Sequence, residues 1–200
     1  MATAPEHRRH CQDFVTDIAA LCTRPAVRTA LKRGRGRPVE DCLDLTPHLS
    51  RLTRSHGARR AHYTVAALIA LTTPSVPETA DPFDENTTPT ARPDTVDDPY
   101  RTPAWRRRPD LGTTLATAVR DHGFNPGRTE DDLKVLVRLA EDQLHRRLPA
   151  LAERLASAGL RPDWAVLLDD LALRAHTAGQ VGTRWLDNFY LHLDTVKDPA

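Results

Sequence analysis

Basic side chains are the residues of this sequence whose spacing first suggests a chemical role. Arg24, Arg28 and Lys32 recur at every fourth residue, and the run Arg-Gly-Arg-Gly-Arg-Pro follows directly at 33–38. Like charges four residues apart destabilise an isolated helix, so such a stripe indicates an anionic partner. We therefore interpret the following as candidate phosphate-binding residues: Arg24, Arg28, Lys32, Arg33 and Arg37.

A second basic set surrounds a helix that we predict to begin at Thr129. Arg128 stands just before that helix, where the N-terminal end of a helix adds its own attraction for phosphate. Arg138 projects away from the apolar face of the helix, and Arg146 and Arg147 follow at the next helix junction. We interpret these four arginines as the second part of a nucleic-acid-binding surface.

Two other readings of the basic residues stay open. Arg-Gly-Arg-Pro at 35–38 is also the core of a minor-groove hook, whose extended arginines enter narrow A·T-rich grooves of duplex DNA. A free-standing DNA-binding protein would use this hook. Alternatively, the chain is a purely structural helical adaptor that assembles without contacting nucleic acid.

Catalytic and metal-binding patterns are absent from the sequence. It contains no Gly-x-Ser-x-Gly, His-Glu-x-x-His or phosphate-loop motif, and its acidic pairs are adjacent residues whose side chains diverge on a helix. His7, His10 and Cys11 could share a helix face, but Cys11 lies on the apolar stripe, as an ordinary buried thiol does. We predict no enzymatic activity, no metal and no cofactor.

The distribution of charge says more than the net charge of +1. Residues 1–71 hold 12 Lys and Arg against 6 Asp and Glu, whereas 72–100 hold 1 against 7. A basic segment followed by an acidic connector is typical of proteins that bind nucleic acid or another acidic surface. Three irregularly spaced cysteines and the lack of a long apolar stretch indicate a soluble cytoplasmic protein without a membrane partner.

Helical spacing of apolar residues is the signal that recurs along the chain, and no alternation typical of strands accompanies it. We predict an all-α bundle of roughly seven to nine helices. Residues 1–72 form an N-terminal helical half with the basic stripe, and residues 110–197 form a C-terminal half. Between them, residues 73–109 contain 8 of the 16 prolines and few aliphatic side chains, which predicts a long, largely disordered acidic loop.

Several short motifs follow one another outside this loop. They are 31–34 (Leu-Lys-Arg-Gly), 110–115 (Asp-Leu-Gly-Thr-Thr-Leu), 133–138 (Leu-Lys-Val-Leu-Val-Arg), 144–148 (Leu-His-Arg-Arg-Leu), 163–164 (Asp-Trp) and 184–190 (Arg-Trp-Leu-Asp-Asn-Phe-Tyr). In these motifs and in their order the chain resembles the CasB family, the small subunit of the type I-E CRISPR Cascade complex. The resemblance covers most of the chain outside 73–109.

The resemblance implies a non-catalytic, all-α subunit of an RNA-guided antiviral complex. Its partners would be the backbone and large subunits of Cascade, the crRNA they carry, a second copy of itself and the target DNA. Family members contact the displaced DNA strand of the R-loop, in which the guide RNA pairs with the other strand. Because R-loop formation is nearly balanced in base-pairing energy, modest backbone contacts from protein decide whether it persists.

Carried over by position, the basic residues of the family motifs are Lys32 or Arg33, Arg138, and Arg146 or Arg147. The other candidates, Arg24, Arg28, Arg37 and Arg128, depend on the charge pattern of this chain alone. One departure from the family concerns 130–132, which reads Glu-Asp-Asp where many relatives carry Glu-Arg-Arg. Arg128 or Lys134 would then replace the missing arginine pair.

Overall fold

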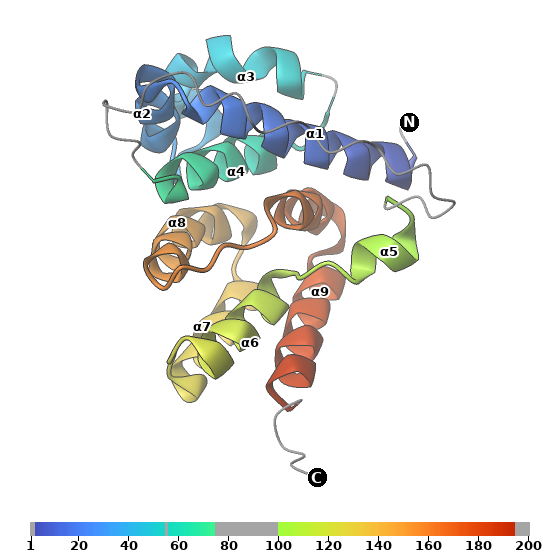
Figure 1. The fold of residues 1–200 in the computed structure, drawn as a ribbon. Helices are drawn as coiled ribbons and strands as arrows, with labels where there is room; N and C mark the ends of the chain where they lie inside the picture. The colour runs from blue at the N-terminus through green and yellow to red at the C-terminus, as the bar shows by residue number, and fades with distance from the viewer. Residues whose placement is uncertain (1–2, 55, 75–99, 195–200) are drawn as a thin grey trace, which may run out of the picture.

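The described part of the chain is all helical. The computed structural model describes residues 3–54, 56–74 and 100–194, and no strand occurs among them (Figure 1). The predicted all-α fold is confirmed. The elements are α1 (Ala4–Cys22), α2 (Pro25–Arg33), the short 3-10 turns η1 (Val39–Asp41) and η2 (Leu43–Leu45), α3 (Thr46–Thr53), α4 (Arg59–Thr72), α5 (Thr102–Arg106), α6 (Leu111–Asp121), α7 (Pro126–Arg138), α8 (Glu141–Ser157) and α9 (Trp164–Asp194).

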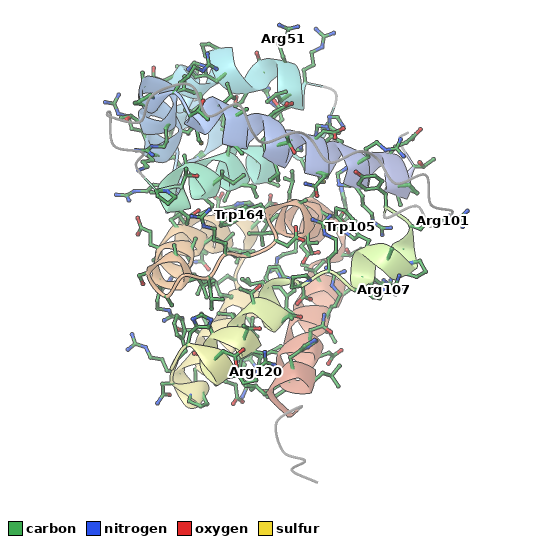
Figure 2. All side chains as sticks on the ribbon, in the orientation of Figure 1. Arg51, Arg101, Trp105, Arg107, Arg120 and Trp164 are labelled. Carbon is green, nitrogen blue, oxygen red and sulfur yellow. The ribbon has the colours of Figure 1, made fainter. Side chains whose placement is uncertain are left out.

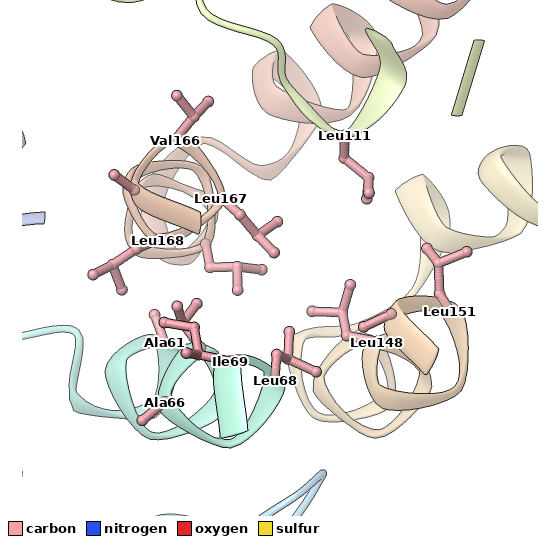
Figure 3. Close-up of a cluster of buried hydrophobic side chains, with 14 of the residues drawn as sticks. Ala61, Ala66, Leu68, Ile69, Leu111, Leu148, Leu151, Val166, Leu167 and Leu168 are labelled. Carbon is pink, nitrogen blue, oxygen red and sulfur yellow. The ribbon is translucent and has the colours of Figure 1, made fainter. Parts of the chain in front are cut away.

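Helix α4 lies at the centre, because nearly all of its residues are buried. Helices α1, α2 and α3 cover one side of it, and α8 with the first part of α9 covers the other (Figure 1). Figure 3 shows Leu68 of α4, Leu148 of α8, Leu167 of α9 and Leu111 of α6 meeting in one buried cluster. The two predicted helical halves therefore share one hydrophobic core.

Side-chain caps set several helix ends, and one of them differs from the prediction. Asp110 accepts a hydrogen bond from the backbone N–H of Thr113 at the start of α6, as the sequence indicates. Helix α7, however, begins at Pro126 with Asn125 as its cap, so the predicted start at Thr129 is wrong. Thr129 is buried inside the helix, and the Asn-Pro pair upstream supplies the cap and the first helical residue.

The helix junction predicted at Arg146 and Arg147 is wrong, because both residues lie within α8. Helix α7 ends at Arg138, and α8 begins at Glu141. Pro149 neither opens nor ends a helix, because α8 runs through it. Helix α9 includes a residue with non-helical backbone angles, Thr177, so its two parts match the two helices predicted there.

A short helix lies within the segment predicted to be a loop. Helix α5 buries Trp105, which is 3% exposed and donates its indole N–H to Asp169 at 2.9 Å. Arg108 lies over the ring of Trp105 and pairs with both carboxylate oxygens of Asp163, at 2.7 and 2.8 Å. These contacts order residues 100–109, and the remainder of the predicted loop, 75–99, lies outside the described residues.

The 110–115 and 184–190 motifs meet where α6 packs on α9. A Cβ atom on Gly112 would lie 1.9 Å from the backbone oxygen of Trp185, so only glycine allows this approach. The indole N–H of Trp185 donates to the buried carboxylate of Asp170 at 2.6 Å, and Arg184 pairs with the same carboxylate. Gly112 therefore allows the close approach of α6 to α9, while Arg184 and Trp185 join the two parts of α9 through Asp170.

No helix of the described residues combines the length and the apolar character needed to cross a membrane.

Candidate nucleic-acid interface

The two basic sets of the sequence meet where the turn after α2 packs against α8. Gly36, at the centre of this turn, has a positive φ of 67°. A Cβ atom on it would lie 3.2 Å from the Cα atom of Arg146, so the backbones of the turn and of α8 are in close contact. Arg35, next to Gly36, pairs with Glu153 of α8 at 3.1 Å. Figure 1 shows α2 and α8 on the same side of the molecule, with α4 between them.

Four predicted residues cluster around this contact with their side chains exposed. Arg33 and Arg37 flank the turn, Arg33 as the last residue of α2, and Arg146 and Arg147 come from α8. None of the four has a hydrogen-bond or ion-pair partner within the part of the chain that the structure describes. Four unpaired guanidinium groups on one surface attract a polyanion, because each can bind a phosphate without first giving up a carboxylate. We call Arg33, Arg37, Arg146 and Arg147, together with Arg128, the basic surface.

Arg128 adjoins this surface across a cleft between α7 and α8. The cleft has a volume of about 300 Å³. Its lining residues are Arg128, Asp132, Val135, Leu136, Arg147, Ala150, Leu151 and Arg154. Arg128 and Arg147 therefore border the same cleft, although they lie on different helices.

The remaining predicted residues are not joined to the basic surface by any contact. Arg24 and Arg28 lie toward the start of α2, and Arg28 donates to the backbone oxygen of Pro74 at 2.7 Å. Lys32 is half-buried in the last turn of α2. Arg138 is exposed at the last residue of α7.

Exposure of arginine alone does not define an interface in this protein. Figure 2 shows Arg51, Arg101, Arg107 and Arg120 on other sides of the molecule. Arg120 is paired with the neighbouring Asp121 at 2.7 Å, which neutralises its charge locally. What distinguishes the basic surface is that segments distant in sequence bring unpaired arginines together.

Two of the three acidic residues at 130–132, Glu130 and Asp132, pair with other side chains of the protein. Glu130 pairs with Lys134 and accepts a hydrogen bond from the hydroxyl of Tyr190 at 2.7 Å. Asp132 accepts a hydrogen bond from Arg154 at 2.8 Å. Lys134 is therefore occupied by Glu130, and of the two proposed replacements for the family's arginine pair only Arg128 is unpaired.

Two residues of this region are missing from the predicted set. Arg35 anchors the turn to α8, and Arg154 forms one wall of the cleft. Arg154 follows Arg147 by seven residues, a spacing that places both on one face of a helix. That spacing is the signal in the sequence that could have identified Arg154.

The rings of His10, His56 and His62 pack together in one cluster. The Nδ1 atom of His62 lies 2.8 Å from the backbone oxygen of Ala58, to which it donates, so its Nε2 accepts a hydrogen bond from His10 at 2.9 Å. The ring of His10 stacks on that of His56, with centroids 3.3 Å apart. Burial lowers the pKa of His62 to about 4, and burial with nearby His56 lowers that of His10 to about 3.

Burial also affects the cysteines. It raises the pKa of the thiols of Cys11, Cys22 and Cys42, which disfavours the thiolate form that binds metals. In the described ranges, no group of three or more His, Cys, Asp or Glu side chains is arranged to hold a metal ion.

Comparison with known proteins identifies the family of this fold and surface. The family described as CRISPR-associated protein Cse2 matches residues 27–190, a range that includes the whole basic surface. A chain of a solved "CRISPR RNA-guided surveillance complex" has a TM-score of 0.73 and 30% sequence identity, covering 95% of this chain and 96% of that chain. A chain of a "CRISPR RNA-guided surveillance complex, pre-nicking" has a TM-score of 0.73 and 32% identity, covering 94% and 96%. No curated protein matches the sequence.

The Cse2 and CasB names denote the same small subunit of the type I-E complex, so the resemblance drawn from the sequence motifs is confirmed. Both structural matches span nearly the full length of the two chains compared. The chain belongs to the Cse2 family of CRISPR-associated proteins.

Proposed function

We propose that this protein stabilises the R-loop of its surveillance complex by holding the displaced DNA strand on the basic surface. It does so without catalysis and without a cofactor. The observation that carries the proposal is the contact of Gly36 with Arg146, which joins two sets of unpaired arginines into one surface. Arginine contacts to phosphate are independent of sequence, as a strand of arbitrary sequence requires.

The same proposal assigns the partners of the subunit. The displaced strand passes over the basic surface, while other faces contact the backbone and large subunits, which carry the crRNA, and a second copy of the small subunit. The family membership supports this assembly.

The structure favours this function over a minor-groove hook. A hook needs an extended arm that is free to enter a groove, whereas Arg35 is paired with Glu153 and Gly36 packs against α8. The backbone from 34 to 36 forms a turn. A hook would require this turn to leave the surface of α8.

The test compares R-loop lifetimes in complexes reconstituted with Arg146→Glu/Arg147→Glu and with Arg51→Glu/Arg54→Glu. Both double variants change the charge equally, but Arg51 and Arg54 lie on and just after α3. Loss of two phosphate contacts at about 1 kcal/mol each shortens the lifetime about 30-fold, and added salt reduces the difference.

Two results would contradict the proposal. If both double variants assemble and have the R-loop lifetime of the unmodified complex, the subunit is a structural adaptor. If the isolated protein instead prefers A·T-rich duplex, and Arg35→Ala/Arg37→Ala abolishes that preference, the hook is the correct reading.

A further inference from the structure

The cleft between α7 and α8 combines an apolar wall with a basic rim. Val135, on α7, is 50% exposed, which is unusual for a large aliphatic side chain in this protein. Leu136 and Leu151 lie beside it, and Arg128 and Arg147 stand at the rim. An exposed apolar surface flanked by unpaired cations suits a ligand that has both a flat apolar part and an anionic part.

Arg154 lines one wall of this cleft and is held there by contacts within the protein. Its Nη1 atom donates to Asp132 at 2.8 Å, and its guanidinium lies over the ring of Phe124. Its Nε and Nη2 atoms are buried and have no hydrogen-bond partner among the described residues. Because these two atoms are closed off from the cleft, the polar groups that a ligand there can reach include the rim arginines Arg128 and Arg147.

We propose that this cleft takes one unstacked base of the single strand, while Arg128 and Arg147 bind the phosphates on either side of it. The inference rests on the proposed function and names the part of the strand that is held. A volume of about 300 Å³ is at the lower end of small-molecule sites, so the cleft accommodates one nucleotide and not a run of bases.

The proposal changes what the basic surface recognises. Phosphate contacts alone cannot distinguish a single strand from the backbone of a duplex. A cleft that needs an unstacked base accepts a displaced strand and rejects a paired one, because the bases of a duplex are held in the stack. The subunit thus selects an opened strand by its free bases.

The experiment measures binding of the full-length protein to two single-stranded 12-mers at low salt. One carries thymine at every position, and the other has the same phosphates but no bases. The unmodified protein should prefer the base-bearing strand about fivefold, the lower end of the contribution of a base stacked on an aromatic ring, because the apolar lining of this cleft is aliphatic. Val135→Asn should remove most of this preference.

A matched control separates the cleft from a general effect of surface polarity. Leu191, on α9, is 63% exposed and does not line this cleft, so Leu191→Asn should keep the preference. Arg146→Gln should weaken binding of both strands equally, because Arg146 is outside the cleft lining. Circular dichroism of each variant confirms that it is folded.

The outcomes separate the two proposals. If both strands bind equally, or if Val135→Asn keeps the preference of the unmodified protein, the base-binding cleft is refuted while phosphate binding stands. If neither strand binds and the reconstituted complex also forms R-loops of unchanged lifetime with Arg146→Glu/Arg147→Glu, the proposed function itself fails.

Discussion

Replacing Gly36 by alanine tests the contact that joins the two basic sets. Alanine in the left-handed region, where Gly36 lies at a φ of 67°, costs about 1–2 kcal/mol. The added Cβ atom would also lie 3.2 Å from the Cα atom of Arg146 and 3.7 Å from the backbone oxygen of His145. These are backbone atoms that cannot rotate away, so α8 or the turn must move, at a further cost of about 1–3 kcal/mol.

Two other glycines serve as controls that separate the cost of the backbone contact with α8 from the cost of the left-handed conformation. Gly123 and Gly159 have φ values of 69° and 76°, and a Cβ atom on either would meet nothing within 4 Å. Gly123→Ala and Gly159→Ala should therefore lose only about 1–2 kcal/mol. Gly36→Ala should lose about 1 kcal/mol more than either control, because only this variant disturbs the packing of the turn on α8.

Urea unfolding of the three variants, followed by circular dichroism, measures the free energies of unfolding. Oligonucleotide binding by fluorescence anisotropy provides the second readout. Gly36→Ala should also bind single-stranded DNA more weakly, since the displaced turn separates Arg33 and Arg37 from α8. If Gly36→Ala matches the two controls in both stability and binding, the turn does not pack on α8 and the basic surface is wrongly assembled.

Three further predictions concern charge, pH and packing. Arg147→Gln should reduce the slope of log affinity against log salt for single-stranded DNA by roughly 0.7, the value for one lost phosphate contact. Arg51→Gln should leave this slope unchanged. If anisotropy titrations give equal slopes for the two variants, the strand does not contact Arg147. The pKa of His62 is about 4 against an ordinary value near 6.5, so the unfolded chain binds a proton first as the pH falls. Stability should therefore decrease below pH 6.5, by about 2 kcal/mol from pH 7 to pH 5 for this residue, and urea unfolding of His62→Gln should show a flatter profile. Gly112→Ala would bring a Cβ atom to 1.9 Å from a backbone oxygen of α9 and should cost at least about 3 kcal/mol in thermal unfolding, while Gly127→Ala, whose Cβ atom would meet only the Oδ1 atom of Asn125 at an ordinary 3.7 Å, should cost nothing.

Local patterns were sufficient to predict the helices and many of their ends. Helical spacing and caps depend on residues within one or two turns, and the cap that Asp110 provides for α6 is of this local kind. The start of α7 was misplaced by three residues, because Thr129 and the acids after it resemble a cap as closely as Asn125 does. Tertiary packing decided between them by burying Thr129.

Local patterns were not sufficient to predict the structure of residues 100–109. Their composition, rich in proline and arginine, indicates a loop when considered alone. The helix there is held by distant partners: Asp169 accepts from the indole of Trp105, and Asp163 pairs with Arg108. Neither partner can be inferred from the local sequence, because both lie more than 50 residues away.

By itself the sequence determined the helical class, the family motifs and the kind of side chain that we propose to meet nucleic acid. Folding decided which of the nine candidate residues lie together. Arg33 and Arg37 lie beside Arg146 and Arg147, with Arg128 across the cleft, while Arg24, Arg28, Lys32 and Arg138 are not joined to them. The physical reason is that charge and helical spacing are local properties. The surface, in contrast, depends on the backbone contact between Gly36 and Arg146, which are separated by more than 100 residues and brought together by the packing of α2 and α8 on α4.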